Sequence, residues 1–420
     1  MKIGAYSSLF NMTPETVRFY VNEGLLIPRC RNSRYDFGEE DKRDMEFLLR
    51  LKSYRFSIYQ IHRILALRRL SNFDSANDLA DYLQLLGGQK MILSQEKNNL
   101  SRAIEEIEQE ITVLSQKGTS VPTVHQGVPL SFLPLLACPH CQKELKLENC
   151  SIERQQILSG ELSCTCGYHA VIRNGILVGE RGPVSPYDGI DAERNCYRMM
   201  SPELLSLVQK AYMQMDEHLS SWDMTGKVVL EDGINNYCFC YTNLINLNPE
   251  TCYIIADKFE EVVMMYKNLI EKLGIRRNIL YIAAGSSFLP LRHGCVDCYI
   301  DFDSSNECAI LEQRYAADAI KKYLSPQAKY LGAFFHFSMN GESVRELHRQ
   351  YPEAWEYSFD SGYFLQRLKE SWEHVEYEEQ FGCVTDSGYG ESFTYHVGKE
   401  PLWLSLYFCS KMKREAGKNE

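Results

Sequence analysis

Apolar residues recur with a helical period over the first third of the chain, most regularly between Gln89 and Gln116. Two interleaved rows repeat every seven residues there, one formed by Leu93, Leu100, Ile107 and Leu114 and the other by Ile104 and Ile111. Glutamates keep the outside charged, and Lys97 takes the remaining slot of the second row. One helix cannot bury such a seam alone. The pattern therefore predicts a partner surface, from a second copy of the chain or from its own C-terminal part.

Shorter helical patterns precede this seam and surround a basic loop. Apolar faces at helical spacing occupy residues 2–10, 39–53 and 58–70, and residues 71–88 are expected to be a helical connector. A further helix begins after Thr13, with proline at its first position, and Gly24 ends it. The loop beyond this helix is basic and aromatic, with Arg29, Arg31, Arg34 and Tyr35. A helix followed by such a loop is suited to enter a DNA groove and hold the flanking phosphates.

From residue 226 onward, short apolar runs alternate with helical segments, and a helix is expected just before, near 202–221. The expected strands are 227–231, 252–257, 278–284, 295–301, 329–337 and 402–409. This repeat predicts a doubly wound, mostly parallel sheet with a site at the carboxyl ends of its strands. Asp301 and Asp303, after the fourth strand, either line that cleft or cap the next helix. The aromatic stretch 386–395 is expected to be a loop, with the alternative that it covers a cleft.

Two closely spaced cysteine pairs follow a linker rich in glycine and proline, residues 117–135. The pairs are Cys138 with Cys141 and Cys164 with Cys166. Thiolates this close together repel each other unless a cation neutralises them, and tetrahedral zinc takes four ligands. We therefore predict a structural zinc ion. The alternatives are that His140 or His169 replaces one sulfur, or that four reduced cysteines are simply buried.

Charge and cysteine usage narrow the class of partner. Residues 1–72 contain 13 Lys and Arg against 8 Asp and Glu, whereas the remaining 348 residues contain 32 against 48. A nucleic-acid partner therefore fits the N-terminal part, and the acidic remainder is expected to avoid DNA. The 15 cysteines are odd in number and mostly scattered, which indicates a reducing cytoplasm. We expect neither a signal peptide nor a membrane span.

The N-terminal residues resemble the winged helix-turn-helix of the MerR family of bacterial transcription regulators, through residues 2–4, 13–20, 23–29 and 34–35 at fixed spacing. The resemblance implies a homodimer on double-stranded promoter DNA, joined by an antiparallel coil over Leu93–Leu114. It also implies a small-molecule effector, RNA polymerase at the promoter, and a place at the nucleoid in the bacterial cytoplasm. The residues expected at DNA are Thr13, Thr16, Arg18, Tyr20, Arg34 and Tyr35, and Arg55 at a second wing either touches phosphate or is solvated.

Residues 226–410 resemble class I S-adenosylmethionine-dependent methyltransferases in the order and spacing of their strands. The resemblance implies that Glu231 and Gly233 belong to the cofactor loop and that Asp257 holds the ribose hydroxyls. The cysteine segment through residue 176 resembles the short zinc module that precedes the methyltransferase domain of bacterial rRNA guanine methyltransferases.

The cofactor loop departs from the methyltransferase pattern. Asn235 and Tyr237 stand where further glycines are expected, and a positive φ is costly at Tyr237. Gly285 replaces the acid that usually meets the adenine amine. No catalytic residue can be carried over. The favoured interpretation is that this domain senses an effector. An active S-adenosylmethionine-dependent methyltransferase, tethered to or autoregulated by the DNA-binding module, is the alternative, and a purely structural domain is a third.

The sequence thus predicts a multidomain protein. The expected parts are a winged helix-turn-helix (1–72), a connector and dimerisation helix (73–117), a zinc ribbon (136–180) and a Rossmann-like α/β methyltransferase fold (200–412).

Overall fold

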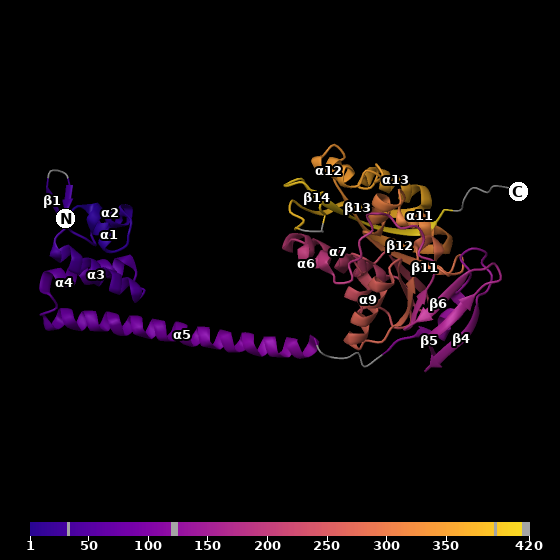
Figure 1. Cartoon of the computed structure of the whole chain (residues 1–420), viewed down its shortest axis with the longest axis horizontal. Helices are drawn as coiled ribbons and strands as arrows, with labels where there is room; N and C mark the ends of the chain where they lie inside the picture. The colour runs from indigo at the N-terminus through magenta and orange to yellow at the C-terminus, as the bar shows by residue number, and fades with distance from the viewer. Residues whose placement is uncertain (32–33, 119–124, 390–392, 414–420) are drawn as a thin grey trace. The chain divides into compact units, whose positions relative to one another are not determined.

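The computed structural model describes residues 1–31, 34–118, 125–389 and 393–413. The chain forms two compact units, Met1–Ser120 and Val121–Glu420 (Figure 1).

The N-terminal unit is helical and carries a two-stranded wing. Its elements are α1 (Ile3–Leu9), α2 (Pro14–Asn22), β1 (Arg29–Arg31), β2 (Arg34–Asp36), α3 (Glu39–Ser53), α4 (Ile58–Ser71) and α5 (Ala76–Gly118). The start of α2 is the predicted one, because the Thr13 hydroxyl accepts the Thr16 N–H and Pro14 holds the first helical position. Gly24, with φ +71°, follows the end of α2 as expected.

A single buried cluster holds α1 to α4 together. It includes Tyr6 from α1, Val17 from α2, Leu48 from α3 and Ile64 from α4. Leu9, an apolar residue within the helix expected at 2–10, is 56% exposed, because Tyr6 and Ser7 are the residues that α1 buries.

The long helix α5 begins earlier than the sequence indicated. It runs from Ala76 through Gly87 and Gly88, which we had placed at the end of a separate connector. Each glycine costs about 1 kcal/mol in a helix, and the strong helix formers on either side carry the helix across both. The later residues of the heptad seam are exposed in the single chain: Leu100, Ile104, Ile107, Ile111 and Leu114, each between 55% and 63%.

The C-terminal unit is built on one sheet, in which twelve strands are described. They are β3 (Val128–Pro129), β4 (Lys146–Glu153), β5 (Gln156–Ser163), β6 (His169–Arg173), β7 (Ile176–Val178), β8 (Val228–Asp232), β9 (Cys252–Asp257), β10 (Asn278–Ala283), β11 (Val296–Phe302), β12 (Leu324–His336), β13 (Trp372–Val384) and β14 (Leu402–Met412). Their order is β13-β14-β12-β11-β8-β9-β10-β7-β6-β5-β3, with β4 beside β5.

The centre of this sheet is parallel and its two flanks are antiparallel. Strands β12, β11, β8, β9, β10 and β7 run in parallel. The chain order reverses at β8, because β9 lies on one side of it and β11 on the other, which is the switch point of a doubly wound fold. Sequence analysis missed β13, an exposed edge strand rich in Glu that lacks an apolar run.

Helices cover both faces of the sheet. They are η1 (Leu130–Leu135), α6 (Asn195–Met199), α7 (Pro202–Ser221), α8 (Phe239–Thr242), α9 (Glu260–Leu273), η2 (Ser286–Phe288), α10 (Ser304–Leu311), α11 (Ala316–Ile320), η3 (Lys321–Tyr323), α12 (Glu342–Gln350) and α13 (Ser361–Ser371). Alternate residues of β9 join opposite cores: Tyr253 and Ile255 pack with α7 and α9, whereas Ile254 and Ala256 pack with α11 and α13. The C-terminal unit is therefore a Rossmann-like, methyltransferase-type α/β fold.

The cysteine-bearing segment shares the sheet of this fold. Strand β7 pairs in parallel with β10, with Ile176 opposite Tyr281, and β6, β5 and β3 continue the order outward. The zinc-ribbon strands and the Rossmann-like strands thus form one hydrogen-bonded sheet. Among the described residues, no helix has both the length and the apolar character needed to cross a membrane.

Candidate functional site

The exposed face of α2 carries the predicted DNA contacts nearest to the helix start. Thr13 and Arg18 are exposed, Thr16 is half-buried, and the two threonine hydroxyls lie 3.1 Å apart. Arg18 Nη1 lies 3.1 Å from Glu15 Oε1, in a pair with side chains 54% and 73% exposed. An exposed pair of this kind contributes about 0–1 kcal/mol, so Arg18 can exchange it for a phosphate or a base edge.

Tyr20 does not lie on this face, and the prediction that it contacts DNA is wrong. It is 2% exposed, and its hydroxyl accepts a hydrogen bond from Lys52 Nζ at 2.9 Å. The reason is helical spacing: Tyr20 lies three residues after buried Val17 and so points to the same core. Phe19 is the exposed ring of this turn, at 46%.

The wing is a short antiparallel ribbon in which Cys30 lies opposite Tyr35. Arg34 is exposed, and the Tyr35 ring packs edge-on against Phe37, with ring centroids 6.2 Å apart. This contact ties the exposed ribbon to the core of the unit.

Arg55 lies in the turn between α3 and α4. Its φ is +62°, and its Nη1 lies 2.8 Å from Glu96 Oε2 on α5. The side chain therefore links the turn to the long helix, and its contact with phosphate stays a prediction.

The four predicted metal ligands meet at one point. Cys138 Sγ lies 3.4 Å from Cys166 Sγ, Cys141 Sγ lies 3.4 Å from Cys164 Sγ, and all four sulfurs lie within 4.8 Å of one another. Tetrahedral zinc with Zn–S bonds of about 2.3 Å spaces its sulfurs by about 3.8 Å. The cluster can therefore hold a zinc ion.

Local backbone geometry explains the unusual one-residue spacer of the second pair. Gly167, with φ +97°, donates its N–H to the Cys164 carbonyl at 3.0 Å and closes a tight turn. The Cys166 backbone N–H lowers the pKa of the Cys164 thiol to about 6. His140 is directed elsewhere, because its Nε2 lies 2.8 Å from Glu180 Oε2. His169 is exposed on β6 and does not belong to the ligand group.

At the end of β8, the predicted cofactor residues serve internal contacts. Glu231 is 2% exposed, and its carboxylate accepts the backbone N–H groups of Phe239 at 2.5 Å and Cys240 at 2.8 Å. It thereby caps α8, while burial raises its pKa. Gly233 has φ +71°, and a Cβ there would lie 2.8 Å from the Ser304 hydroxyl. The positive φ and the close approach of α10 together require glycine at this position.

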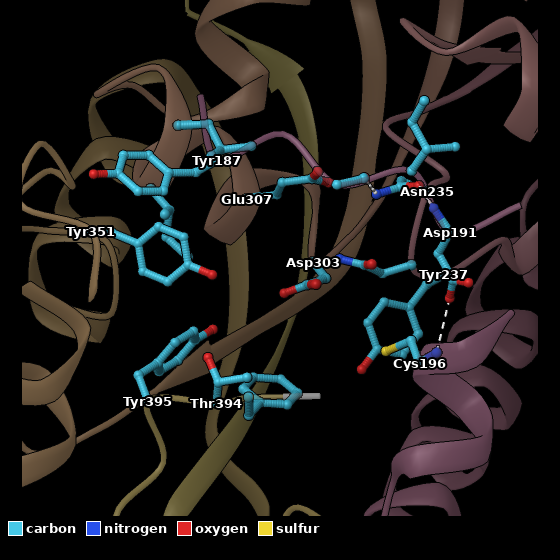
Figure 2. A pocket seen from close by; sticks show the side chains of 16 residues that line it. Tyr187, Asp191, Cys196, Asn235, Tyr237, Asp303, Glu307, Tyr351, Thr394 and Tyr395 are labelled. Atoms are coloured by element: carbon cyan, nitrogen blue, oxygen red, sulfur yellow. Dashed lines mark hydrogen bonds between the residues drawn. The ribbon is translucent and has the colours of Figure 1, made fainter. Parts of the chain in front are cut away.

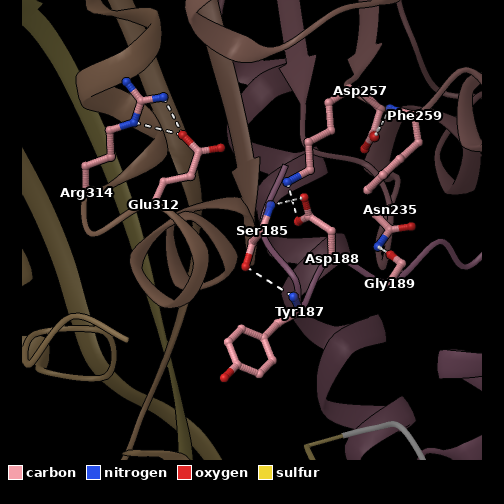
Figure 3. A network of polar contacts seen from close by, with 10 residues as sticks. Ser185, Tyr187, Asp188, Gly189, Asn235, Asp257, Phe259, Glu312 and Arg314 are labelled. Atoms are coloured by element: carbon pink, nitrogen blue, oxygen red, sulfur yellow. Dashed lines mark hydrogen bonds and ion pairs between the residues drawn. The ribbon is translucent and has the colours of Figure 1, made fainter. Parts of the chain in front are cut away.

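At the end of β9, Asp257 is equally enclosed. It is 2% exposed, its Oδ1 accepts the Phe259 N–H at 2.8 Å, and burial raises its pKa well above the usual range. Lys258 follows it and pairs with Asp188, with Nζ and Oδ1 2.6 Å apart and side chains 14% and 1% exposed (Figure 3).

Residues 185–191 form a segment that we call the strap. Asn235, in the loop after β8, donates to the Gly189 carbonyl at 2.8 Å and accepts the Asp191 N–H at 2.9 Å. With the Lys258–Asp188 pair, these bonds fix the strap to the loops after β8 and β9 (Figure 3). Asn235 and Tyr237 both avoid the left-handed region, so the bulkier loop is accommodated without backbone strain.

A pocket of about 450 Å³ opens beside the strap. Its walls come from the strap, α6, the loop after β8, α10 with its N-cap residue, the residue after α12, and residues 393–395. The side chains that define its chemistry are Tyr187, Tyr237, Asp303, Glu307, Tyr351 and Tyr395 (Figure 2). Burial raises the pKa of Glu307 to about 7 and that of Asp303 well above its usual range. Predicted Asp301 is not in the pocket, since it binds Ser305 and Tyr330 in the core.

Sequence reasoning found this pocket only in part. Lining a cleft was only one alternative for Asp303, and covering a cleft was the alternative for the late aromatic stretch. Asp303 and residues 393–395 do line the pocket, although residues 390–392 lie outside the described residues. Glu307 could have been found, because it lies one helical turn after Asp303. Tyr187 and Tyr351 carry no local signal, since folding alone brings them together.

Solved structures similar to the C-terminal part include methyltransferases. A crystal structure of MccD protein has 12% identity and TM-score 0.36, covering 49% of this chain and 96% of that one. A SAM-dependent methyltransferase from Aquifex aeolicus has 14% identity and TM-score 0.33, covering 53% of this chain and 99% of that one. A putative methyltransferase from Bacillus halodurans C-125 has 11% identity and TM-score 0.34, covering 51% of this chain and 100% of that one. At these values the likenesses say nothing about chemistry.

No match was found among curated proteins. Residues 1–67 match the sequence model of the family described as MerR HTH family regulatory protein, and the N-terminal unit therefore carries a MerR-type helix-turn-helix domain.

Proposed function

We propose that the protein is a transcription regulator of MerR type that binds promoter DNA as a homodimer and carries an effector-sensing C-terminal unit. The DNA contacts would come from the exposed face of α2, with Thr13, Thr16 and Arg18, and from the wing, with Arg34 and Tyr35. The net positive charge of residues 1–72, against the acidic remainder, supports this assignment. Action in the bacterial cytoplasm, at the nucleoid and beside RNA polymerase, belongs to the same proposal.

The dimer in this proposal forms through the seam of α5. Exposed leucines and isoleucines at seven-residue spacing are what a coiled-coil partner buries. An antiparallel partner helix over Leu93–Leu114 would separate the two α2 helices by a fixed distance and so set the spacing of the two DNA half-sites.

The sensing role is supported by a contrast between buried acids at the strand ends and an open pocket beside them. Glu231 and Asp257 are 2% exposed; Glu231 caps α8, and Asp257 accepts the N–H of Phe259, the residue before α9. The strap covers that side through Asp188, whereas the adjoining pocket of about 450 Å³ stays open. A domain whose predicted cofactor-binding acids are enclosed, and whose open pocket lies beside them against the loop after β8, is better suited to binding a small molecule than to methyl transfer.

A ligand could act on DNA through small shifts in protomer geometry. Bending a DNA site costs on the order of 1–6 kcal/mol. A ligand that favours one arrangement of the two protomers by a comparable amount would choose between two DNA shapes at the promoter.

The test of DNA binding is Arg18→Ala, assayed by gel shift on selected operator DNA and by size-exclusion chromatography. We expect DNA binding to be lost while the dimer stays folded. Arg276→Ala, which removes one exposed arginine from the C-terminal unit, is the matched control and should bind normally. Normal binding by Arg18→Ala would show that the docking is wrong.

The alternative function is an S-adenosylmethionine-dependent methyltransferase tethered to a DNA-binding module. It is favoured by the α/β fold and by Gly233 at the end of β8. It requires the strap to leave the ends of β8 and β9, because Asp257 has to reach a ribose. Transfer of a labelled methyl group by the purified protein would support it.

A further inference from the structure

The pocket beside the strap has an unusual lining for its size. Among the described residues that line it there is no lysine, arginine or histidine. Its charged side chains are all acidic, and aromatic rings form much of the remaining wall (Figure 2). A pocket with this lining presents negative potential to whatever enters it.

The Asp303 carboxylate is available to a ligand. Asp303 is the N-cap residue of α10, with φ +69°, and its side chain makes no capping hydrogen bond. The Asn236 amide is its one polar neighbour that lowers its pKa, while burial and Glu307 raise it. Figure 2 shows its carboxylate in the space toward which the hydroxyls of Tyr351 and Tyr395 point.

Glu307 adds a second carboxylate four residues along the same face of α10. The groups that act on it are Lys258, Asp188, Glu312 and the Asn235 amide. Lys258 is already paired with Asp188 at 2.6 Å. Burial raises the pKa of Glu307, and a cation that enters the pocket would favour the ionised form of this carboxyl.

The aromatic wall is continuous. The ring centroids of Tyr187 and Tyr351 are 5.2 Å apart, those of Tyr351 and Tyr395 are 6.2 Å apart, and those of Phe393 and Tyr395 are 5.9 Å apart. Aromatic faces attract cations through the ring quadrupole, most strongly when the site is shielded from water.

We propose that this pocket binds an organic cation, an ammonium or quaternary ammonium that carries apolar groups, with Asp303 and Glu307 as its counter-ions. An anion would meet two carboxylates and no base. A divalent metal ion would lack its oxygen ligands, because among the described residues only the cysteine cluster brings three or more ligand atoms close together. The proposal names the ligand class for the effector site and rests on the proposed function.

The experiment is calorimetric titration of the full-length, zinc-loaded protein with three probes of one shape. They are benzyltrimethylammonium, its neutral isostere neopentylbenzene and the anion phenylmethanesulfonate. We expect one benzyltrimethylammonium per chain, at least tenfold tighter binding than for neopentylbenzene, and no binding of phenylmethanesulfonate. Equal affinity for the cation and its isostere, or no binding of the cation, overturns the proposal.

Variants then place the cation in the pocket. Asp303→Asn keeps a residue that tolerates the left-handed conformation, and Glu307→Gln keeps the side-chain volume. Each should weaken benzyltrimethylammonium binding at least tenfold, and thermal unfolding checks the fold. The exposed Glu250→Gln removes the same charge outside the pocket and should change nothing. Unchanged binding in both pocket variants overturns the proposal.

A gel shift on the same samples separates the two claims. If no probe cation binds while DNA is still bound, the ligand class is wrong and the DNA-binding role stands. If the cation binds but leaves DNA affinity unchanged, the pocket assignment stands and the effector role is wrong.

Discussion

Several family-motif residues are exposed in the N-terminal unit, whereas two are buried in the C-terminal unit. In the N-terminal unit, Thr13 and Arg18 lie on the open surface of α2, and their side chains make only local contacts. In the C-terminal unit, Glu231 and Asp257 are each 2% exposed, and both accept backbone N–H groups inside the fold. A motif residue that matches a family in sequence is therefore available for binding only where the rest of the fold leaves it uncovered.

Removal of the metal should cause the largest loss of stability, and this loss should be limited to the C-terminal unit. Structural zinc sites contribute on the order of 10 kcal/mol to folding. We expect Cys138→Ser, or a chelator, to abolish metal content and loosen residues 136–180, as measured by elemental analysis and hydrogen exchange. The control is Cys150→Ser, an exposed cysteine outside the ligand group. The N-terminal dimer should persist, and unchanged stability with no metal in the parent protein would remove zinc from the account.

The next largest loss of stability is expected when Glu231, the acid at the end of β8, is replaced. Each carboxylate oxygen of Glu231 accepts one backbone N–H group. In Glu231→Gln, an NH₂ group replaces one of these oxygens, so one backbone N–H faces a donor and loses its acceptor. An unsatisfied buried group costs about 1–3 kcal/mol, so chemical denaturation should show a loss of that size in the C-terminal unit. DNA binding should stay normal. Equal stability of Glu231→Gln and the exposed Glu250→Gln would mean that Glu231 is not a structural cap.

The pH dependence of stability should also differ between the units. Burial raises the pKa of Asp232 and of Glu307 to about 7. The folded state then holds protons that the unfolded chain releases between about pH 4 and 7, so these groups stabilise the C-terminal unit below that window and lose the effect as pH rises through 7. Each contributes a slope of at most about 1.4 kcal/mol per pH unit.

Asp232→Asn tests this slope by thermal unfolding from pH 5 to pH 8. The groups that act on Asp232 are the Ser286 side chain, the Gly233 backbone and the carboxylates of Glu312 and Asp301. We expect a flatter profile in the variant and an unchanged profile in Glu250→Gln. A parent protein whose stability rises steadily from pH 5 to pH 8 would contradict the prediction.

The smallest effect is expected at the wing. Arg34 is exposed on β2, and a phosphate contact adds about one unit to the salt slope of DNA binding. Arg34→Ala should therefore weaken binding to all DNA sequences by a similar factor and lower the slope of log affinity against log salt by about one. A change in sequence preference would instead mean that Arg34 reads bases.

Local signals made much of the fold predictable. Thr13 and Pro14 marked the start of α2, and the apolar run at 252–257 coincides with β9. The helix expected near 202–221 is α7, Pro202–Ser221. The cysteine spacing identified the four sulfurs that meet. The helix starts and the strand are determined by neighbouring residues, whereas the cysteines were found because metal ligands occur in closely spaced pairs.

Features that depend on distant partners were not predictable. The strap is fixed by the contact of Asp188 with Lys258, 70 residues along the chain. Tyr20 was expected at DNA from the MerR resemblance, but it is buried in the core, where its hydroxyl binds Lys52. The burial of Asp257 likewise depends on loops that no local pattern connects to β9.

The most direct test of the account is calorimetric titration of the purified protein with S-adenosylmethionine, with S-adenosylhomocysteine as its companion. Because Glu231 and Asp257 are enclosed and the strap is bonded over the ends of β8 and β9, we predict no binding of either compound at micromolar concentration. One-to-one binding with micromolar affinity would contradict this account, show that the strap yields to the cofactor, and favour the methyltransferase.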